Sequence, residues 1–284
     1  MGSIKRHARA LAVVIGALSL VAIAGTTALA GKGLKTKSAT VSVDPGENGS
    51  ATAKCKRGTK AVSGGFEAEF DPAGPVFYMS ESRRDGGRKW TSAAFNVSGA
   101  SGDLTSFAYC RDQKLKTKSA TTEVDPGELD SVTATCKRGE KAFSGGFAAE
   151  EIDAGAMSTP VFFPTQSLKQ GKRAWTASAY NSGSGEGDLT AYVHCREGKS
   201  VKTKQADETL DTGEFDSAEA RCSRKQRVVS GGFDTDSDWT TTGALLMESQ
   251  KLGKRGWEVA AQDAGGQPHD LVAYAYCEKK KKKG

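Results

Sequence analysis

The chain is built from one sequence pattern that occurs three times. The heptapeptide that opens the pattern, Leu34-Lys-Thr-Lys-Ser-Ala-Thr, returns at residue 115 and, in diverged form, at residue 201. The copies therefore start 81 and 86 residues apart. A period of this length indicates three similar folding units, because each segment meets the same folding problem with the same residues.

Each copy carries the same landmarks in the same order. An acidic turn is followed by a cysteine, a Ser-Gly-Gly-Phe motif, a tryptophan with an amide or acid six residues later, and an Asp-Leu pair before a closing cysteine. In the three copies these landmarks are Asp44-Pro-Gly-Glu47, Asp125-Pro-Gly-Glu128 and Asp211-Thr-Gly-Glu214; Cys55, Cys136 and Cys222; Phe66, Phe147 and Phe233; Trp90, Trp175 and Trp257; Asn96, Asn181 and Asp263; Asp103, Asp188 and Asp270; and Cys110, Cys195 and Cys277.

Within a copy the periodicity is that of β-strands. The segments that start at Trp90, Trp175 and Leu271 are short, rich in aromatic or β-branched residues and bounded by Gly, Ser and Asp. The acidic turns fit type II turns, and the paired glycines indicate a bulge or a close backbone approach. We expect an all-β fold of three tandem, disulfide-closed, antiparallel β-sandwich-like repeats of about 80 residues, with six or so strands each.

Six cysteines, two per copy, are the strongest chemical signal. Six cysteines allow fifteen pairings, but the repeat symmetry favours Cys55 with Cys110, Cys136 with Cys195 and Cys222 with Cys277. Each bond would stabilise the fold by up to about 4 kcal/mol in the chain-entropy model. Metal ligation is disfavoured because the spacing does not resemble Cys-x-x-Cys.

The first thirty residues predict a secretory signal peptide. A basic start precedes an apolar run from Ala10 to Gly25 and an Ala28-Leu-Ala30 end, and we place cleavage after Ala30. The alternative is a membrane anchor, for which the run is short. The predicted domains are the signal (1–30), three β repeats (31–112, 113–198 and 199–278) and a polybasic tail (279–284). Short linkers predict repeats that touch, either in a row or around a pseudo-threefold axis.

The formal net charge of +6 is misleading about the folded repeats. Removing the three basic residues of the signal and the five lysines from Lys279 to Lys283 leaves 32 basic against 34 acidic residues. We therefore expect no nucleic-acid partner. Because the apolar run of the signal is short for a spanning helix, we also expect no membrane-spanning segment in the mature chain. The lysine tail is either a solvated end or a weak, salt-sensitive contact to anionic polymer or lipid.

The order of these motifs resembles tandem Cys-bracketed repeats of secreted bacterial, often actinobacterial, proteins that have no established activity. The resemblance covers residues 34 to 277 and implies an extracellular β-sandwich-like module without catalytic residues. The immunoglobulin family fits less well, because Trp90 lies 35 residues after Cys55 where that family has its tryptophan after about a dozen.

Catalytic patterns are weak in this sequence. His194 and His269 are the only histidines after the predicted signal, neither recurs in the other copies, and we expect both to be exposed in loops. Recurring carboxylates at Asp103, Asp188 and Asp270, and at Glu47, Glu128 and Glu214, leave a glycosidase-type hydrolase as an alternative, although turn hydrogen bonding explains them more simply.

Other ligand sites were weighed against structural explanations. Asp234-Thr-Asp-Ser-Asp238 starts like a calcium loop but lacks its glycine and its final glutamate. A polar, solvated loop explains it more simply, with a weak calcium site as the alternative, and we predict no metal and no cofactor. The shared tryptophans are expected in the core. The segments after each Ser-Gly-Gly-Phe vary in length and are the better candidates for ligand recognition, with Tyr78, Phe163 and Trp239 as their aromatic residues.

The sequence thus predicts a secreted, non-enzymatic binding or structural module. Cell-wall polymer or another carbohydrate is the expected ligand class, since three repeats offer avidity from weak sites. The alternatives are a secreted hydrolase and a purely structural envelope or matrix component.

Overall fold

The structure, a computed structural model, describes residues 33–69, 76–150, 152, 159–236 and 242–280. The predicted signal peptide and Trp239 lie outside these residues, as do Asp238 of the calcium-like loop and the end of the lysine tail. The described residues form antiparallel strands joined by turns, which confirms the all-β prediction. Over these ranges the protein has no helix that would reach across a bilayer.

Each repeat supplies six strands in the same order. Repeat 1 contains β1 (Lys35–Val43), β2 (Asn48–Lys54), β3 (Lys60–Ala68), β4 (Phe77–Asp85), β5 (Lys89–Asn96) and β6 (Gly102–Arg111). Repeat 2 contains β7 (Lys116–Val124), β8 (Leu129–Thr135), β9 (Glu140–Ala149), β10 (Phe162–Gln170), β11 (Ala174–Asn181) and β12 (Gly187–Glu197). Repeat 3 contains β13 (Lys202–Leu210), β14 (Phe215–Arg221), β15 (Gln226–Asp234), β16 (Ala244–Leu252), β17 (Gly256–Asp263) and β18 (His269–Lys279).

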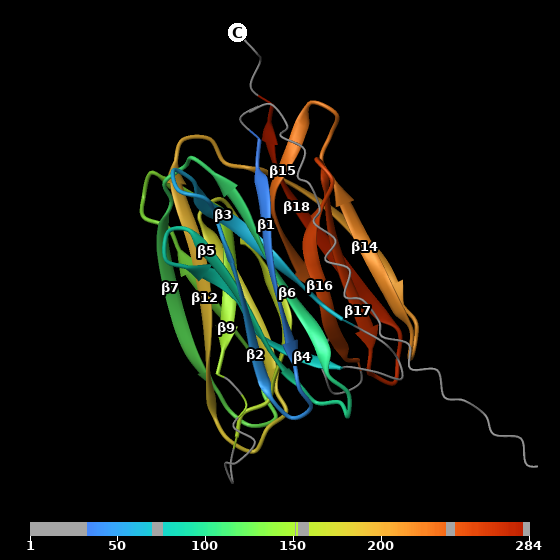
Figure 1. Ribbon diagram of the computed structural model, residues 1–284. Helices are drawn as coiled ribbons and strands as arrows, with labels where there is room; N and C mark the ends of the chain where they lie inside the picture. The colour runs from blue at the N-terminus through green and yellow to red at the C-terminus, as the bar shows by residue number, and fades with distance from the viewer. Residues whose placement is uncertain (1–32, 70–75, 151, 153–158, 237–241, 281–284) are drawn as a thin grey trace, which may run out of the picture. The chain divides into compact units, whose positions relative to one another are not determined.

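The repeats share their sheets. Each of the three six-stranded sheets takes three strands from one repeat and three from another, in the orders β1-β6-β3-β16-β17-β14, β2-β5-β4-β9-β12-β7 and β13-β18-β15-β10-β11-β8. Every repeat is thereby joined to both of the others (Figure 1). Where two repeats meet in a sheet, β3 pairs with β16, β9 with β4 and β15 with β10, and we call these pairings the repeat seams. The strands β3, β9 and β15 also contact one another around a central axis, as do β4, β10 and β16. Of the two arrangements left open by the sequence, the protein adopts the pseudo-threefold one.

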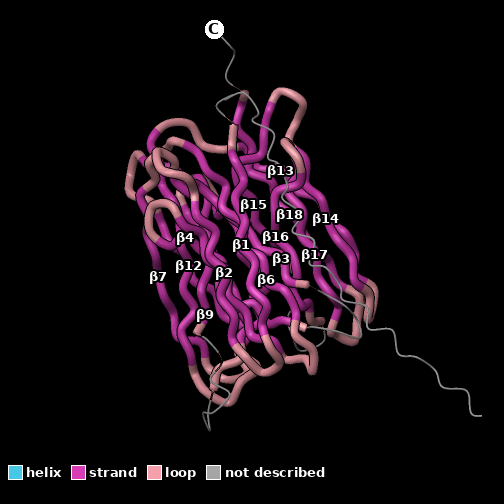
Figure 2. Tube along the Cα trace, in the orientation of Figure 1, coloured by secondary structure: helices cyan, strands magenta, loops and turns pink. Residues whose placement is uncertain are grey.

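The turns gather at two opposite ends of the strands (Figure 2). One end carries the three disulfides, and we call it the disulfide end. The other, which we call the turn end, carries the acidic turns between the first and second strand of each repeat. At the third position of these turns Gly46, Gly127 and Gly213 have φ values of 74°, 78° and 75°. A positive φ at that position is what a type II turn requires, so this prediction is confirmed.

The paired glycines are sites of close approach. A Cβ on Gly64 would lie 2.2 Å from the ring of Trp90, and a Cβ on Gly65 would lie 2.2 Å from the carbonyl oxygen of Ser249 in repeat 3. The first glycine therefore makes room for the tryptophan of its own repeat and the second for the backbone of a neighbouring repeat. The same two approaches recur at Gly145 and Gly146 and at Gly231 and Gly232. A β-bulge is also present in each of these strands, but at Val62, Phe143 and Val229, just before the motif and not at the glycines.

The three tryptophans are core residues, as expected. Trp90, Trp175 and Trp257 are at most 2% exposed, and each indole N–H donates to a serine hydroxyl of the neighbouring strand at 3.0 or 3.1 Å. Around the axis, Ser144 Oγ donates to the carbonyl of Val62 at 2.6 Å and Ser63 Oγ donates to that of Val229 at 2.5 Å. These bonds tie one repeat to the next near the axis.

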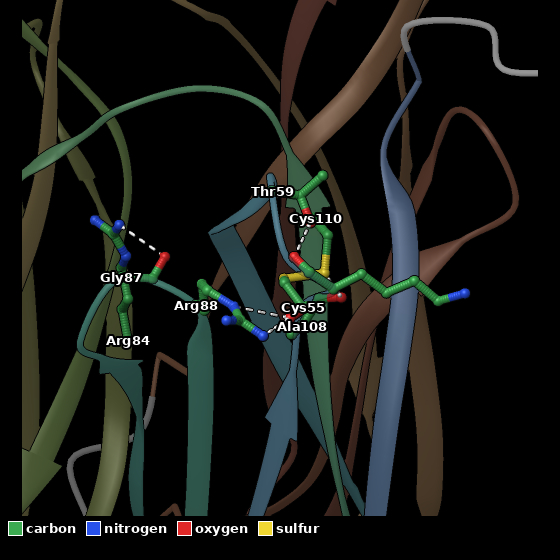
Figure 3. The surroundings of a disulfide bond; sticks show 8 residues. Cys55, Thr59, Arg84, Gly87, Arg88, Ala108 and Cys110 are labelled. Atoms are coloured by element: carbon green, nitrogen blue, oxygen red, sulfur yellow. Dashed lines mark hydrogen bonds between the residues drawn. A yellow bond between two sulfur atoms is a disulfide. The ribbon is translucent and has the colours of Figure 1, made fainter.

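All three disulfides close within a repeat, as the repeat symmetry favoured. Cys55 bonds Cys110, Cys136 bonds Cys195 and Cys222 bonds Cys277, with Cα–Cα distances of 5.6 to 5.7 Å. In repeat 1 the Arg88 guanidinium donates to the Cys55 carbonyl from Nε at 3.1 Å and from Nη2 at 2.9 Å (Figure 3). Hydrogen bonds therefore link the disulfide to the basic hairpin that follows β4, and we call this part of each repeat its basic corner.

Candidate functional site at the disulfide end

The phenylalanines of the three Ser-Gly-Gly-Phe motifs mark the middle of the sheets. The residues paired in register with them define a row across each sheet, which we call the Phe row. It consists of Ala39, Ser106, Phe66, Ser249, Val259 and Ala218; of Ala120, Ala191, Phe147, Ser82, Ser92 and Ala51; and of Ala206, Ala273, Phe233, Ser167, Ala177 and Val132. The row itself carries no charge and separates the disulfide half of the protein from the turn half.

Charge is segregated across the Phe row. Every Lys and Arg among the described residues lies in the disulfide half, either on a strand segment or in a turn or linker at that end. The described part of the turn half has none. Most described Asp and Glu residues lie in the turn half; those in the disulfide half are Asp85, Asp112, Glu140, Glu197, Glu219, Glu258 and Glu278. A nearly neutral folded body therefore presents one strongly basic end and one acidic end.

This distribution follows from which residues each repeat places beside its disulfide. The opening Lys-Thr-Lys of β1, β7 and β13 pairs with the segment that ends in the closing cysteine. The turn after each first cysteine adds Arg57, Arg138 and Arg224, all exposed. The hairpin before each tryptophan adds further basic residues, among them Arg88, Arg173 and Arg255, whose carbonyls accept the N–H of the first cysteine at 2.8 Å. The basic end is thus repeated three times around the axis.

Two hollows open at the basic end. In repeat 3 a groove of about 800 Å³ is lined by Thr203, Ser223, Gln226 and six basic residues, Lys202, Lys204, Arg224, Lys225, Lys279 and Lys280. Between repeats 1 and 2 a hollow of about 570 Å³ is lined by Arg84, Lys114, Lys116, Arg196 and others, but it also contains Glu140 and Glu197. Acidic side chains therefore line only the second of these two hollows.

The centre of the basic end is held by a charge cluster on the axis. The residue after each closing cysteine is Arg111, Arg196 or Glu278, so the symmetry is broken in repeat 3. Glu278 accepts from Arg111 Nη1 at 2.6 Å and from Arg196 Nη1 at 2.7 Å, and both guanidinium groups lie over the Phe143 ring. The hydrogen bonds from the two arginines hold the pKa of Glu278 below its ordinary value, against the opposing effect of desolvation. Three equivalent arginines would repel one another here, and Glu278 removes that repulsion.

The structure brings two of the predicted aromatic residues together at the other end. Tyr78 and Phe163 occupy equivalent positions on β4 and β10, and their ring centroids lie 4.7 Å apart in an edge-to-face contact. Phe163 is buried and Tyr78 is half-buried. The segments after the Ser-Gly-Gly-Phe motifs of repeats 1 and 2 therefore return at one place beside the axis. Ligand binding by Tyr78, Phe163 and Trp239 stays a prediction.

The histidines are not exposed, so that expectation was wrong. His194 is fully buried and takes the place of Tyr109 and Tyr276 of the other repeats. Desolvation, and then the charge of Arg84, lower the pKa of His194 to about 3. His269 is 7% exposed, with Nδ1 lying 3.3 Å from Oδ1 of the buried Asp263. His194 packs against the Trp90 ring, and its Nδ1 shares a hydrogen bond with the Thr117 hydroxyl at 3.1 Å.

The recurring carboxylates are solvent-exposed. The three aspartates lie on paired strands, and the three glutamates, Glu47, Glu128 and Glu214, lie in the acidic turns. Asp103, Asp188 and Asp270 are exposed, and the backbone N–H of Asp103 donates to Glu69 Oε2 at 2.9 Å. A carboxyl with a raised pKa, which acid catalysis needs, lies elsewhere. Burial, with Glu258 and Glu67 nearby, raises the pKa of Glu248 to about 7. No motif pointed to Glu248; the signal was its cross-strand pairing with Glu67 across the repeat seam.

The structure describes the calcium-like segment only as far as Asp236. Asp234 accepts from Gln166 Nε2 at 2.9 Å and from the Asp236 backbone N–H at 3.2 Å, so its carboxylate is engaged by the protein. Glu123, Asp125 and Glu186 bring carboxylate oxygens within 4.8 Å of one another, and all three are exposed. Exposed acidic groups of this kind are common in proteins without a bound ion.

Comparison with protein-family models and with curated proteins gives no match for this chain.

Proposed function

We propose that the protein is a secreted, non-enzymatic binding module that holds an anionic cell-wall polymer or other acidic carbohydrate at its disulfide end. The observation that carries the proposal is the confinement of every described Lys and Arg to that end. A surface with one sign of charge attracts a polyanion over a longer range than a mixed surface does, and each neutralised anionic group adds to the affinity.

The threefold repetition supports the same function. Three similar basic corners surround one axis, so a polymer with repeating anionic groups meets three weak sites that lie a fixed distance apart. Linked weak sites raise the overall affinity well above that of one site. The three disulfides, which are typical of extracellular proteins, fit a ligand outside the cell.

The proposal is tested with the mature chain, starting at residue 31, on immobilised acidic and neutral polysaccharides and on purified cell wall. We expect retention on the acidic polymer and the wall, little retention on the neutral polymer, and a steep loss of binding as salt rises. The triple variant Arg57→Gln, Arg138→Gln and Arg224→Gln, all exposed, should weaken binding by about tenfold or more.

A matched control uses the opposite end. Asp103→Asn, Asp188→Asn and Asp270→Asn also change three exposed, equivalent residues, and should leave binding unchanged or slightly tighter. Retention that does not respond to salt, or equal loss in both triple variants, would refute the proposed surface. Tighter binding to duplex DNA than to any acidic polysaccharide would replace the proposed ligand class with nucleic acid.

A further inference from the structure

We infer that the groove of repeat 3 is the primary anion site of the protein and takes a phosphate or sulfate group. This inference rests on the proposed function and assigns its strongest contact to one repeat. The groove is defined by Lys202 and Lys204 on β13, by the turn after Cys222, and by Lys279 and Lys280 at the end of β18.

The walls of the groove are fixed by backbone contacts. The Lys280 N–H donates to the Lys225 carbonyl at 3.1 Å, and Lys280 Nζ donates to the Arg224 carbonyl at 2.9 Å. The end of β18 is thereby tied to the turn after Cys222. On the other side, Lys202 and Lys204 are two residues apart on one strand, so their side chains project from the same face. Cationic side chains from three chain segments therefore meet around one hollow.

In repeat 2 the region equivalent to the groove contains acidic side chains of the protein itself. Strand pairing matches Lys279 and Gln226 of repeat 3 to Glu197 and Glu140 of repeat 2. Lys116 Nζ donates to Glu140 Oε1 at 2.8 Å, and this hydrogen bond raises the pKa of Lys116 and lowers the pKa of Glu140. The basic side chains of repeat 2 are therefore partly neutralised from within.

Repeat 1 has fewer acidic side chains than repeat 2 at the equivalent positions, and the groove of repeat 3 has none. The counterpart of Lys279 in repeat 1, two residues after the closing cysteine, is Asp112, whereas the lining of the repeat 3 groove includes no Asp or Glu. The three corners are thus similar in fold but graded in charge. The repeat 3 groove, which is lined by six cations and no carboxylate, gains most from binding an anion with several oxygens, to which Lys and Arg donate charge-assisted hydrogen bonds.

The test measures binding of small anions to the mature chain by calorimetry at low salt. The probes are inorganic tripolyphosphate, a sulfated oligosaccharide and a uronic-acid oligosaccharide of equal length. We expect one strong site per chain for the first two probes and weaker binding of the carboxylate probe. Lys202→Gln with Lys279→Gln should weaken that site by about tenfold, whereas the matched Lys35→Gln with Lys37→Gln in repeat 1 should change it less than about twofold.

A second variant tests the inference by gain of binding. Glu140→Gln with Glu197→Lys gives repeat 2 the residues that repeat 3 has at these two positions, and should raise the stoichiometry of tripolyphosphate from one to two. A single strong site for sulfate but not tripolyphosphate would assign a sulfated ligand, and the reverse a phosphate ligand. Equal losses in the repeat 1 and repeat 3 variants, with no second site in the gain variant, overturn the inference. If the inference fails in this way but the protein is still retained on the acidic polymer, the proposed function stands. If the protein neither shows the strong small-anion site nor is retained on the acidic polymer, the proposed function is refuted as well.

Discussion

Replacing His194 with tyrosine should make the protein more resistant to acid. The side chain before each closing cysteine packs on a tryptophan of another repeat: Tyr109 on Trp257, Tyr276 on Trp175 and His194 on Trp90, with ring centroids 5.4 to 5.7 Å apart. Two of the three positions hold tyrosine. The variant His194→Tyr therefore restores the residue that the fold uses at the equivalent positions.

The contacts of the tyrosines explain what His194 lacks. Tyr109 Oη accepts the Lys251 N–H at 2.7 Å, and Tyr276 Oη accepts the Lys169 N–H at 2.7 Å. The shorter His194 shares a hydrogen bond with Thr117 through Nδ1 at 3.1 Å, and its buried Nε2 has no hydrogen-bond partner among the described residues. The neighbouring Arg84 adds a positive charge. Protonation of this ring would therefore place a second positive charge in a buried site.

The size of the effect follows from proton linkage. The pKa of His194 is lowered from 6.5 to about 3, so between these values the unfolded chain binds a proton that the folded chain does not. Stability contributed by the neutral ring is complete above pH 6.5 and is lost as the pH falls toward 3. Each pH unit in this window costs about 1.36 kcal/mol, which makes about 2.7 kcal/mol at pH 4.5.

The assay is denaturant unfolding of the oxidised wild type and variant at pH 7.0, 5.5 and 4.5. The difference in unfolding free energy between the two proteins should grow by about 2.7 kcal/mol from pH 7.0 to 4.5, because all other titrating groups are common to both. Tyr276→His is the matched reverse change and should introduce a second loss of the same kind. A difference that stays constant with pH would refute a buried neutral His194, as would an NMR titration that gives His194 a pKa near 6.5.

Three further predictions concern the fold. Glu278→Gln removes the carboxylate shared by the partly buried Arg111, Arg196 and Arg227 and should cost about 2–4 kcal/mol, measured as a lower denaturant midpoint, whereas an unchanged midpoint would show that the cluster contributes nothing. Gly65→Ala should destabilise the protein by more than about 3 kcal/mol, because its Cβ would meet a backbone oxygen at 2.2 Å. The control Gly46→Ala, at a residue with a φ of 74° and open space around it, should cost about 1 kcal/mol. Equal losses of stability in thermal melts of the two variants would contradict this prediction. Glu248→Gln should stabilise the protein above pH 7 relative to pH 5, by about 1–2 kcal/mol after solvent screening, because burial raises the carboxyl pKa and its ionisation therefore costs stability; a pH-independent difference would oppose this.

Features set by local chemistry could be predicted from the sequence. The glycine of each acidic turn needs a positive φ, a requirement that residue type alone conveys. The disulfide pairing followed from the repeat symmetry, because two cysteines that recur in every copy have a partner within the copy. The tryptophans were expected in the core because each starts an alternating strand.

The sharing of sheets between repeats could not be predicted from the sequence. The seam between β3 and β16 is paired through Glu67 with Glu248 and Phe66 with Ser249 alone. The second glycine of each pair makes that approach possible, but a Gly-Gly motif does not say whether the backbone it meets belongs to its own repeat. The buried His194 was missed for the same reason, since its packing partner Trp90 lies in another repeat.

The separation of basic and acidic residues between the two ends was only partly predictable from the sequence. Net charge alone hid it, because a folded body with nearly equal numbers of acids and bases looks neutral. The signal is positional: in each copy the basic residues occur close to the two cysteines and to the hairpin before the tryptophan. Antiparallel strands that meet at a disulfide bring those three segments to the same end, as Lys35 opposite Cys110 does in repeat 1. Once strand direction is assigned, the sequence of a disulfide-closed β repeat therefore indicates which end of the fold is basic, and summed charge does not.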